Sequence, residues 1–218
     1  MTSERNAAER LADTMPTLEH LDTSLRGKRM IGNIMGIHGP PEPRAKQIAD
    51  GYVRLVEKTI IDYQEARNKL FLFMAGGGEF DNYCRAQDFI ESSVQSLHRA
   101  ILYLDKLRRF GFCGADGSPF VPKPRELTVL RDKVKARVRK LRDACEHLDE
   151  DIIDGKISPN SDVAIHLGSK AVDLNGITIS YVDLAKWMEQ LHHFALLLSC
   201  VQITVGKPPK STEGEPSA

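Results

Sequence analysis

The sequence predicts an all-α protein, an antiparallel four-helix bundle with a small β-hairpin inserted between helices three and four. Apolar residues recur at steps of three and four through four long stretches, which is the period of a buried helical stripe. The four stretches are residues 44–75, 79–110, 125–154 and 181–204. Only residues 163–180 change to the alternation of apolar and polar residues that a strand requires. Because short to medium connections join the four stretches, a bundle is the natural architecture.

The first predicted helix ends at three consecutive glycines, residues 76–78. Tyr52, Val56 and Tyr63 mark its apolar stripe. A run of glycines can also cradle a phosphate, but no strand precedes this run and no Lys-Ser or Lys-Thr pair follows it. The glycines therefore indicate a helix stop.

The second predicted helix has the most regular pattern in the chain. Two series of residues recur every seven positions: Phe80, Gln87, Val94 and Ile101, and Tyr83, Ile90, Leu97 and Leu104. Such a seam is typical of a helix that packs along another long helix. A loop of glycine, proline and serine, residues 111–124, then turns the chain back, so we expect an antiparallel partner.

The third predicted helix, residues 125–154, has a long apolar stripe and carries the most informative motif of the chain. Its apolar stripe consists of Leu127, Leu130, Val134, Val138, Leu141, Cys145, Leu148 and Ile152. Beyond it, residues 171–174 and 177–180 flank Asn175-Gly176, a pair that favours a two-residue hairpin with a primed turn. This β-hairpin is predicted to be an insertion into the bundle.

Length and composition indicate one domain with two appendages. A chain of 218 residues can bury a core without metals or disulfides. We assign residues 44–205 to the helical domain and residues 1–43 to a mobile N-terminal arm, in which residues 4–14 could form a short helix. Residues 206–218 are rich in Pro, Ser, Glu and Lys, which predicts a disordered tail.

Charge and metal-ligand patterns exclude several classes of function. The thirty basic and thirty acidic residues cancel, so nucleic-acid binding would need a local basic patch. The four cysteines form no Cys-x-x-Cys pair, which predicts reduced thiols. His192 and His193 lack the Glu-x-x-His partners of a di-metal helical site. We therefore expect no metal and no cofactor.

The last predicted helix is apolar nearly all round, so we expect it to be the most buried. Its most apolar stretch, residues 194–205, is interrupted by Ser199, Gln202 and Thr204. It is also shorter than the roughly 20 residues that span a bilayer. The N-terminus has no apolar core of the kind a secretory signal needs. These features predict a cytoplasmic protein without a membrane partner.

The third helix carries one motif with chemical content, Arg142-Asp143-Ala144-Cys145-Glu146-His147. This Arg-x4-His pattern, in a long amphipathic helix of a predicted bundle, resembles the signature of the HEPN superfamily. The resemblance implies a metal-independent endoribonuclease of the kind found in toxin–antitoxin and phage-defence systems, with a site composed at a homodimer interface. It also implies that Arg142 holds the scissile phosphate and that His147 moves protons, while an antitoxin or complex partner could restrain the activity.

The chemistry of RNA cleavage fits these residue types independently of the family. Attack by the 2′-hydroxyl needs a group that exchanges a proton near neutral pH, which histidine does. It also needs a fixed positive fork for the charge that builds on the phosphate, which arginine supplies. Asp143 lies four residues before His147 on the same helical face, so we expect its carboxylate to orient the imidazole.

Helical geometry sets a condition on this site. On an ideal helix Arg142 and His147 lie about 140° apart, so one phosphate can contact both only if the helix is distorted or a second protomer contributes. Basic residues earlier in the helix, namely Arg131, Lys135 and Arg139, could bind the RNA backbone.

The alternative is a non-catalytic helical module that acts through protein partners in a regulatory or defence complex. Under this alternative, the charged residues of the motif form a solvated face held by ion pairs between successive helical turns.

Overall fold

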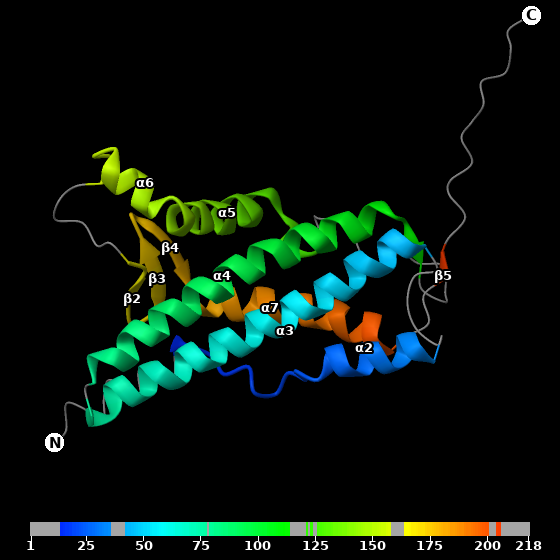
Figure 1. The fold of residues 1–218 in the computed structure, drawn as a ribbon, viewed down its shortest axis with the longest axis horizontal. Helices are drawn as coiled ribbons and strands as arrows, with labels where there is room; N and C mark the ends of the chain where they lie inside the picture. The colour runs from blue at the N-terminus through cyan, green and yellow to red at the C-terminus, as the bar shows by residue number, and fades with distance from the viewer. Residues whose placement is uncertain are drawn as a thin grey trace, which may run out of the picture.

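The computed structural model describes residues 14–35, 42–77, 79–113, 121, 123, 126–157, 164–200 and 204–205. This part of the chain is mostly helical, with a small three-stranded antiparallel sheet toward its C-terminal side (Figure 1). The predicted helix-rich fold with a small β insertion is thereby confirmed.

Two long helices form the centre of the fold. α3 (Pro43–Leu72) and α4 (Phe80–Arg109) run side by side in opposite directions along most of their length (Figure 1). The Glu42 carboxylate accepts from the Ala45 N–H and Pro43 occupies the first helical turn, which together fix the start of α3. A π-helical turn, η1 (Phe73–Gly77), ends it at the predicted glycines.

The predicted seam of α4 is the part of this helix that is buried against α3. The fully buried members of the two series are Ile90, Val94, Leu97, Ile101 and Leu104. Phe80, at the start of the first series, is instead exposed, because α3 has given way to η1 opposite it. The seven-residue period therefore predicted the contact face but not its end.

α7 (Tyr181–Cys200) lies against α3 and α2, and most of its length is buried. Tyr52 of α3 donates a hydrogen bond from its hydroxyl to the Leu191 carbonyl at 2.7 Å, which ties the two helices together. The prediction of a nearly all-round apolar helix is confirmed here. Its predicted end is not, because Thr204–Val205 form β5, paired antiparallel with β1 (Phe112–Cys113). Both residues of β5 are β-branched, which favours strand over helix.

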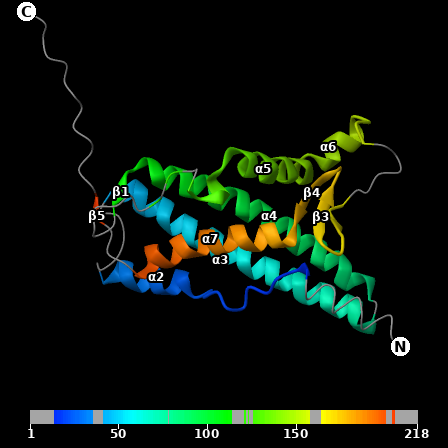
Figure 2. The same ribbon diagram turned by 180° about the vertical axis from the view of Figure 1, so that it is seen from behind.

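Residues 14–35, which belong to the predicted N-terminal arm, contribute side chains to the core. Met15, Leu18 and Leu25 are fully buried, and α2 (Leu25–Ile34) packs against α3 and α7. Figure 2 shows α2 beside α7, at the far side of the molecule from α5. Met15 and Leu18 lie outside regular helix and Leu25 begins α2, so these apolar residues show no helical period although they cover the core.

The predicted third helix is divided in the structure. A 3-10 turn, η2 (Thr128–Leu130), leads into α5 (Asp132–Glu146), and α6 (Leu148–Ile153) follows after a break at His147. Val138 and Leu141 are the buried residues of α5, which lies on α4, whereas α6 buries none. The break arises where the apolar stripe no longer meets a packing surface.

The sheet confirms the predicted hairpin and adds a strand to it. β3 (Ala171–Leu174) pairs with β4 (Ile177–Ser180), and β2 (His166–Leu167) pairs with the other edge of β3. Asn175 and Gly176 have φ values of 52° and 76°, which are those of a primed two-residue turn. The sheet contacts α5 and α7, so it supports the helix that carries the Arg-x4-His motif.

Within the described segments, the helices include none with the length and apolar character needed to cross a membrane. The short helix expected at residues 4–14 lies outside the described residues, apart from Thr14, and so does the tail expected at residues 206–218.

Candidate functional site

The Arg-x4-His motif spans the C-terminal turn of α5 and the break that follows it. Arg142 is next to the buried Leu141, and its side chain is 22% exposed. His147 is the C-cap of α5, with φ −104° and ψ 10°, and its N–H donates to the Asp143 carbonyl at 3.0 Å. The helix that holds the arginine therefore ends at the histidine.

Arg142 is bound by two carboxylates of its own helix. Nη1 donates to Glu146 Oε2, and Nη2 lies 3.1 Å from Asp143 Oδ1. Nε is buried and has no hydrogen-bond partner among the described residues. The guanidinium is thus held in place with one donor unused.

The expected hydrogen bond from Asp143 to His147 is not formed. Asp143 instead lies between two arginines, Arg142 at 3.1 Å and Arg139 at 3.4 Å. His147, whose side chain is 55% exposed, has its Nδ1 3.1 Å from Glu150 Oε2. The two arginines hold the Asp143 carboxylate. The carboxylate that contacts His147 is therefore that of Glu150, in the following turn.

A groove of about 510 Å³ separates α4 from α5. The described residues that line it are His98, Ile101, Leu102, Asp132, Lys135, Ala136, Arg139, Lys140 and Asp143. We call it the α4–α5 groove. Two of the three predicted RNA-binding residues, Lys135 and Arg139, are in its wall, and Lys135 lies 3.0 Å from Asp132. The third, Arg131, is exposed just before α5 and does not line the groove.

His98 is a residue of the α4–α5 groove that the sequence did not single out. It is only 8% exposed, and no described residue forms a hydrogen bond with its ring. Burial lowers the pKa of this histidine, and the positive charge of Arg142 lowers it further, while Asp143 and Glu146 oppose the shift. The available signal was positional, because residue 98 lies four positions after Val94 and three before Ile101, at the edge of the heptad seam.

Other charges of α5 have structural contacts. Arg137 donates from Nε to the Thr178 carbonyl at 2.8 Å and lies 3.6 Å from Asp183, which ties α5 to the sheet and to α7. The basic face of α5 therefore divides into an anchor at Arg137 and a groove wall at Lys135 and Arg139.

Two other kinds of chemistry find little support in this region. Cys145 is half-buried, and its burial together with Glu91 and Glu146 raises the pKa of its thiol to about 12, so it is not an activated nucleophile. In the part of the chain that the structure describes, no group of three or more His, Cys, Asp or Glu side chains is arranged to hold a metal ion. The charged groups available are therefore guanidinium, ammonium, carboxylate and imidazole.

Comparison of the chain with models of protein families, with curated proteins and with solved structures finds no match. The function must be argued from the geometry of the α4–α5 groove and of the motif beside it.

Proposed function

We propose that this protein is a HEPN-like, metal-independent endoribonuclease that acts in the cytoplasm as a homodimer, in a toxin–antitoxin or phage-defence setting. Its four predicted helices, here α3, α4, α5 with α6, and α7, correspond to the antiparallel bundle of that superfamily. The observation that carries the proposal is the helix break at His147. A distortion at this position supports the proposal, because on an ideal helix Arg142 and His147 lie about 140° apart and one phosphate could not contact both.

The proposed reaction uses the RNA's own 2′-hydroxyl. Its oxygen attacks the adjacent phosphorus while the bond to the 5′-oxygen of the next nucleotide breaks, leaving a 2′,3′-cyclic phosphate and a 5′-hydroxyl. Arg142 stabilises the charge on the phosphate. His147 transfers a proton at the attacking or leaving oxygen through Nε2, since Nδ1 contacts Glu150.

Asp143 is assigned a positioning role in this proposal. It acts on Arg142 rather than on His147, because its carboxylate lies 3.1 Å from the guanidinium. The phosphate then takes the place of Glu146 at Nη1. Lys135 and Arg139 support this arrangement by placing positive charge in the α4–α5 groove, where an RNA backbone can approach.

The proposed homodimer is supported by α6. Ile152 and Ile153 are 43% and 84% exposed there, directly after His147. A second copy covering these side chains would remove apolar surface from water and bring another polar surface to the motif.

The proposal is tested by incubating RNA with the full chain in excess chelator. We expect cleavage that yields cyclic phosphate ends and is lost, by about 100-fold or more, in both Arg142→Ala and His147→Ala. Lys133→Ala is the matched control, because Lys133 is an exposed cation of α5 outside the groove. Absence of cleavage, or activity that survives both substitutions, would contradict the proposal.

A second candidate function is favoured by the ion pairs of the motif. Arg142 is bound by Asp143 and Glu146, and His147 contacts Glu150, all within one chain. This is the arrangement expected of a non-catalytic helical module in a regulatory or defence complex. The same experiment separates the two, since the module would bind its partner protein without cleaving RNA.

A further inference from the structure

Two adjoining pockets lie between α2, α3 and α4, away from the Arg-x4-His motif. Their volumes are about 300 and 440 Å³, and both are lined by Arg26 of α2 and Arg54 of α3. Arg99 of α4 lines the larger one. We call the two pockets together the arginine groove, after these three residues.

The three arginines share one feature. Arg26, Arg54 and Arg99 form no ion pair with any described residue, although most described arginines do. They come from three different helices, so the fold rather than a local sequence run brings them together. Placing like charges around one hollow is unfavourable unless an anion shares the hollow.

The three carboxylates in the wall of the groove offset these charges only in part, because Arg26, Arg29, Arg54, Lys58 and Arg99 outnumber them. Each of the three carboxylates in its wall already has another partner: Asp50 accepts from Arg29 and Asn33, Asp62 accepts from Lys58, and Glu57 accepts from the Arg26 N–H at the start of α2. Burial raises the pKa of the Glu57 carboxyl, while the backbone N–H and the positive charge of Arg26 oppose this shift. The groove therefore keeps an excess of positive charge.

The inner end of the groove contains two polar atoms without partners. Arg29 is only 2% exposed, and its Nε and Nη1 donate to Asp50 and to the Leu198 carbonyl at 2.5 and 2.6 Å. Its Nη2 is buried with no hydrogen-bond partner among the described residues, and so is Asn33 Oδ1. A buried donor and a buried acceptor are thus unsatisfied at the same end of one pocket, which is unfavourable unless a bound group satisfies them.

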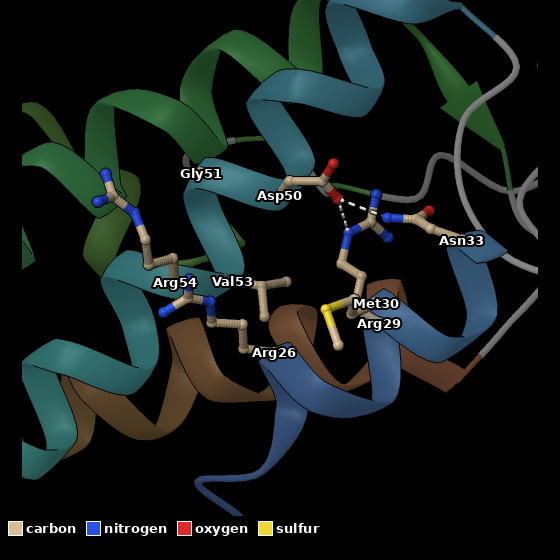
Figure 3. Close-up of a pocket in the computed structure, with 8 residues that line it drawn as sticks. All are labelled: Arg26, Arg29, Met30, Asn33, Asp50, Gly51, Val53 and Arg54. Atoms are coloured by element: carbon tan, nitrogen blue, oxygen red, sulfur yellow. Dashed lines mark hydrogen bonds and ion pairs between the residues drawn. The ribbon is translucent and has the colours of Figure 1, made fainter.

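Figure 3 shows how these parts are arranged. Arg29, Asn33 and Asp50 gather at one end, the side chains of Arg26 and Arg54 lie at the other, and Met30 and Val53 lie between them. The smaller pocket therefore has a cationic end, an apolar middle and a polar inner end.

We propose that the arginine groove binds a small organic phosphate. Its phosphate group lies among Arg26, Arg54 and Arg99, because guanidinium forks match phosphate oxygens in pairs. Its less polar body contacts Met30 and Val53, and its far polar atoms reach toward Arg29 and Asn33. The combined hollow is large enough for a molecule of nucleotide size. This site stands apart from the proposed RNA cleavage, since none of its residues belongs to the Arg-x4-His motif.

The test measures binding of ADP and of pyrophosphate to the full chain by titration calorimetry. We expect ADP to bind, and we expect Arg26→Gln and Arg54→Gln each to weaken it about tenfold or more, because each removes a charged hydrogen bond. Arg44→Gln is the matched control. Arg44 is also an exposed arginine of α3 without a described ion pair, but it does not line the groove.

Two RNA hexamers, one with a 5′-phosphate and one with a 5′-hydroxyl, identify the source of the phosphate. ADP binding that is lost in the groove variants assigns a free organic phosphate. Binding of the 5′-phosphorylated hexamer alone, lost in the same variants, assigns the same phosphate site to an RNA end.

The proposal is overturned if no probe binds at about 1 mM, or if Arg26→Gln and Arg54→Gln bind as the wild type does. Thermal melts confirm that the variants fold, as expected for exposed side chains. Arg142→Ala should leave ADP binding unchanged, so the outcome is distinguishable from a failure of the ribonuclease proposal.

Discussion

At the scale of single residues, two tyrosines of α3 illustrate what a buried polar group requires. Tyr52 and Tyr63 are both fully buried, and burial raises the pKa of both hydroxyls, so both stay protonated. Tyr52 donates to the Leu191 carbonyl at 2.7 Å, whereas the Tyr63 hydroxyl has no described partner. Both tyrosines belong to the predicted apolar stripe of this helix, so the sequence could not tell which hydroxyl has a hydrogen-bond partner.

This difference predicts opposite effects of the same substitution. Tyr52→Phe should lower the free energy of unfolding by about 1 kcal/mol, because it removes the hydrogen bond from the hydroxyl to the Leu191 carbonyl. Tyr63→Phe should leave the free energy unchanged or raise it, because it removes an unsatisfied hydroxyl. Urea denaturation of both variants measures the difference, and equal losses would contradict the assigned hydrogen bond.

At the scale of elements, the break between α5 and α6 is the feature with the greatest consequence for function. The apolar period continues through Cys145, Leu148 and Ile152, and it therefore predicts an unbroken helix. Ile152 is exposed, however, and α6 has no buried residue. The apolar spacing alone indicates which face of a helix could be buried. The neighbouring surface determines along how much of its length that face is buried.

The hairpin element allows a prediction that depends on backbone conformation. Gly176→Ala should destabilise the protein by about 1–2 kcal/mol, because φ is 76° there and a side chain is strained at that angle. Gly27→Ala is the matched control, because a Cβ in the interior of α2 would meet nothing within 4 Å. It should stabilise by about 0.5–1 kcal/mol, since alanine favours the helix.

Thermal unfolding measures both glycine variants. The two melting temperatures should move in opposite directions, by about 2–4 °C per kcal/mol for a chain of this length. A lower melting temperature in both variants would show that the strained turn at Gly176 is not the cause of the destabilisation.

At the scale of the whole molecule, α2 and the segment before it complete the core. Met15, Leu18 and Leu25 are fully buried, and Arg67 donates to the Met15 carbonyl at 2.9 Å. On the opposite side, α5 covers α4 (Figure 1). The central α3–α4 pair is thus covered from both sides, and each cover contributes one wall of a candidate site.

Removing the N-terminal cover should therefore destabilise the whole fold. A chain that begins at residue 42 loses three buried apolar side chains, each contributing about 1.5–3 kcal/mol, which is a large part of a typical domain's stability. We expect a lower melting temperature and a broad transition by circular dichroism. A chain that begins at residue 14 is the control, and equal melting of the two would contradict a contribution of residues 14–41 to stability.

The sequence by itself determined the helix-rich fold, the starts of α3, α4 and α7, the hairpin turn at Asn175-Gly176 and the position of Arg142 and His147 along the chain. These follow from local rules, namely apolar period, capping and turn chemistry. Only the tertiary structure decided that residues 14–35 cover the core, that α5 ends at His147, that His98 lies in the α4–α5 groove, and that Arg26, Arg54 and Arg99 converge. Each of these depends on which distant surface a residue meets, and periodicity within one segment carries no information about that surface.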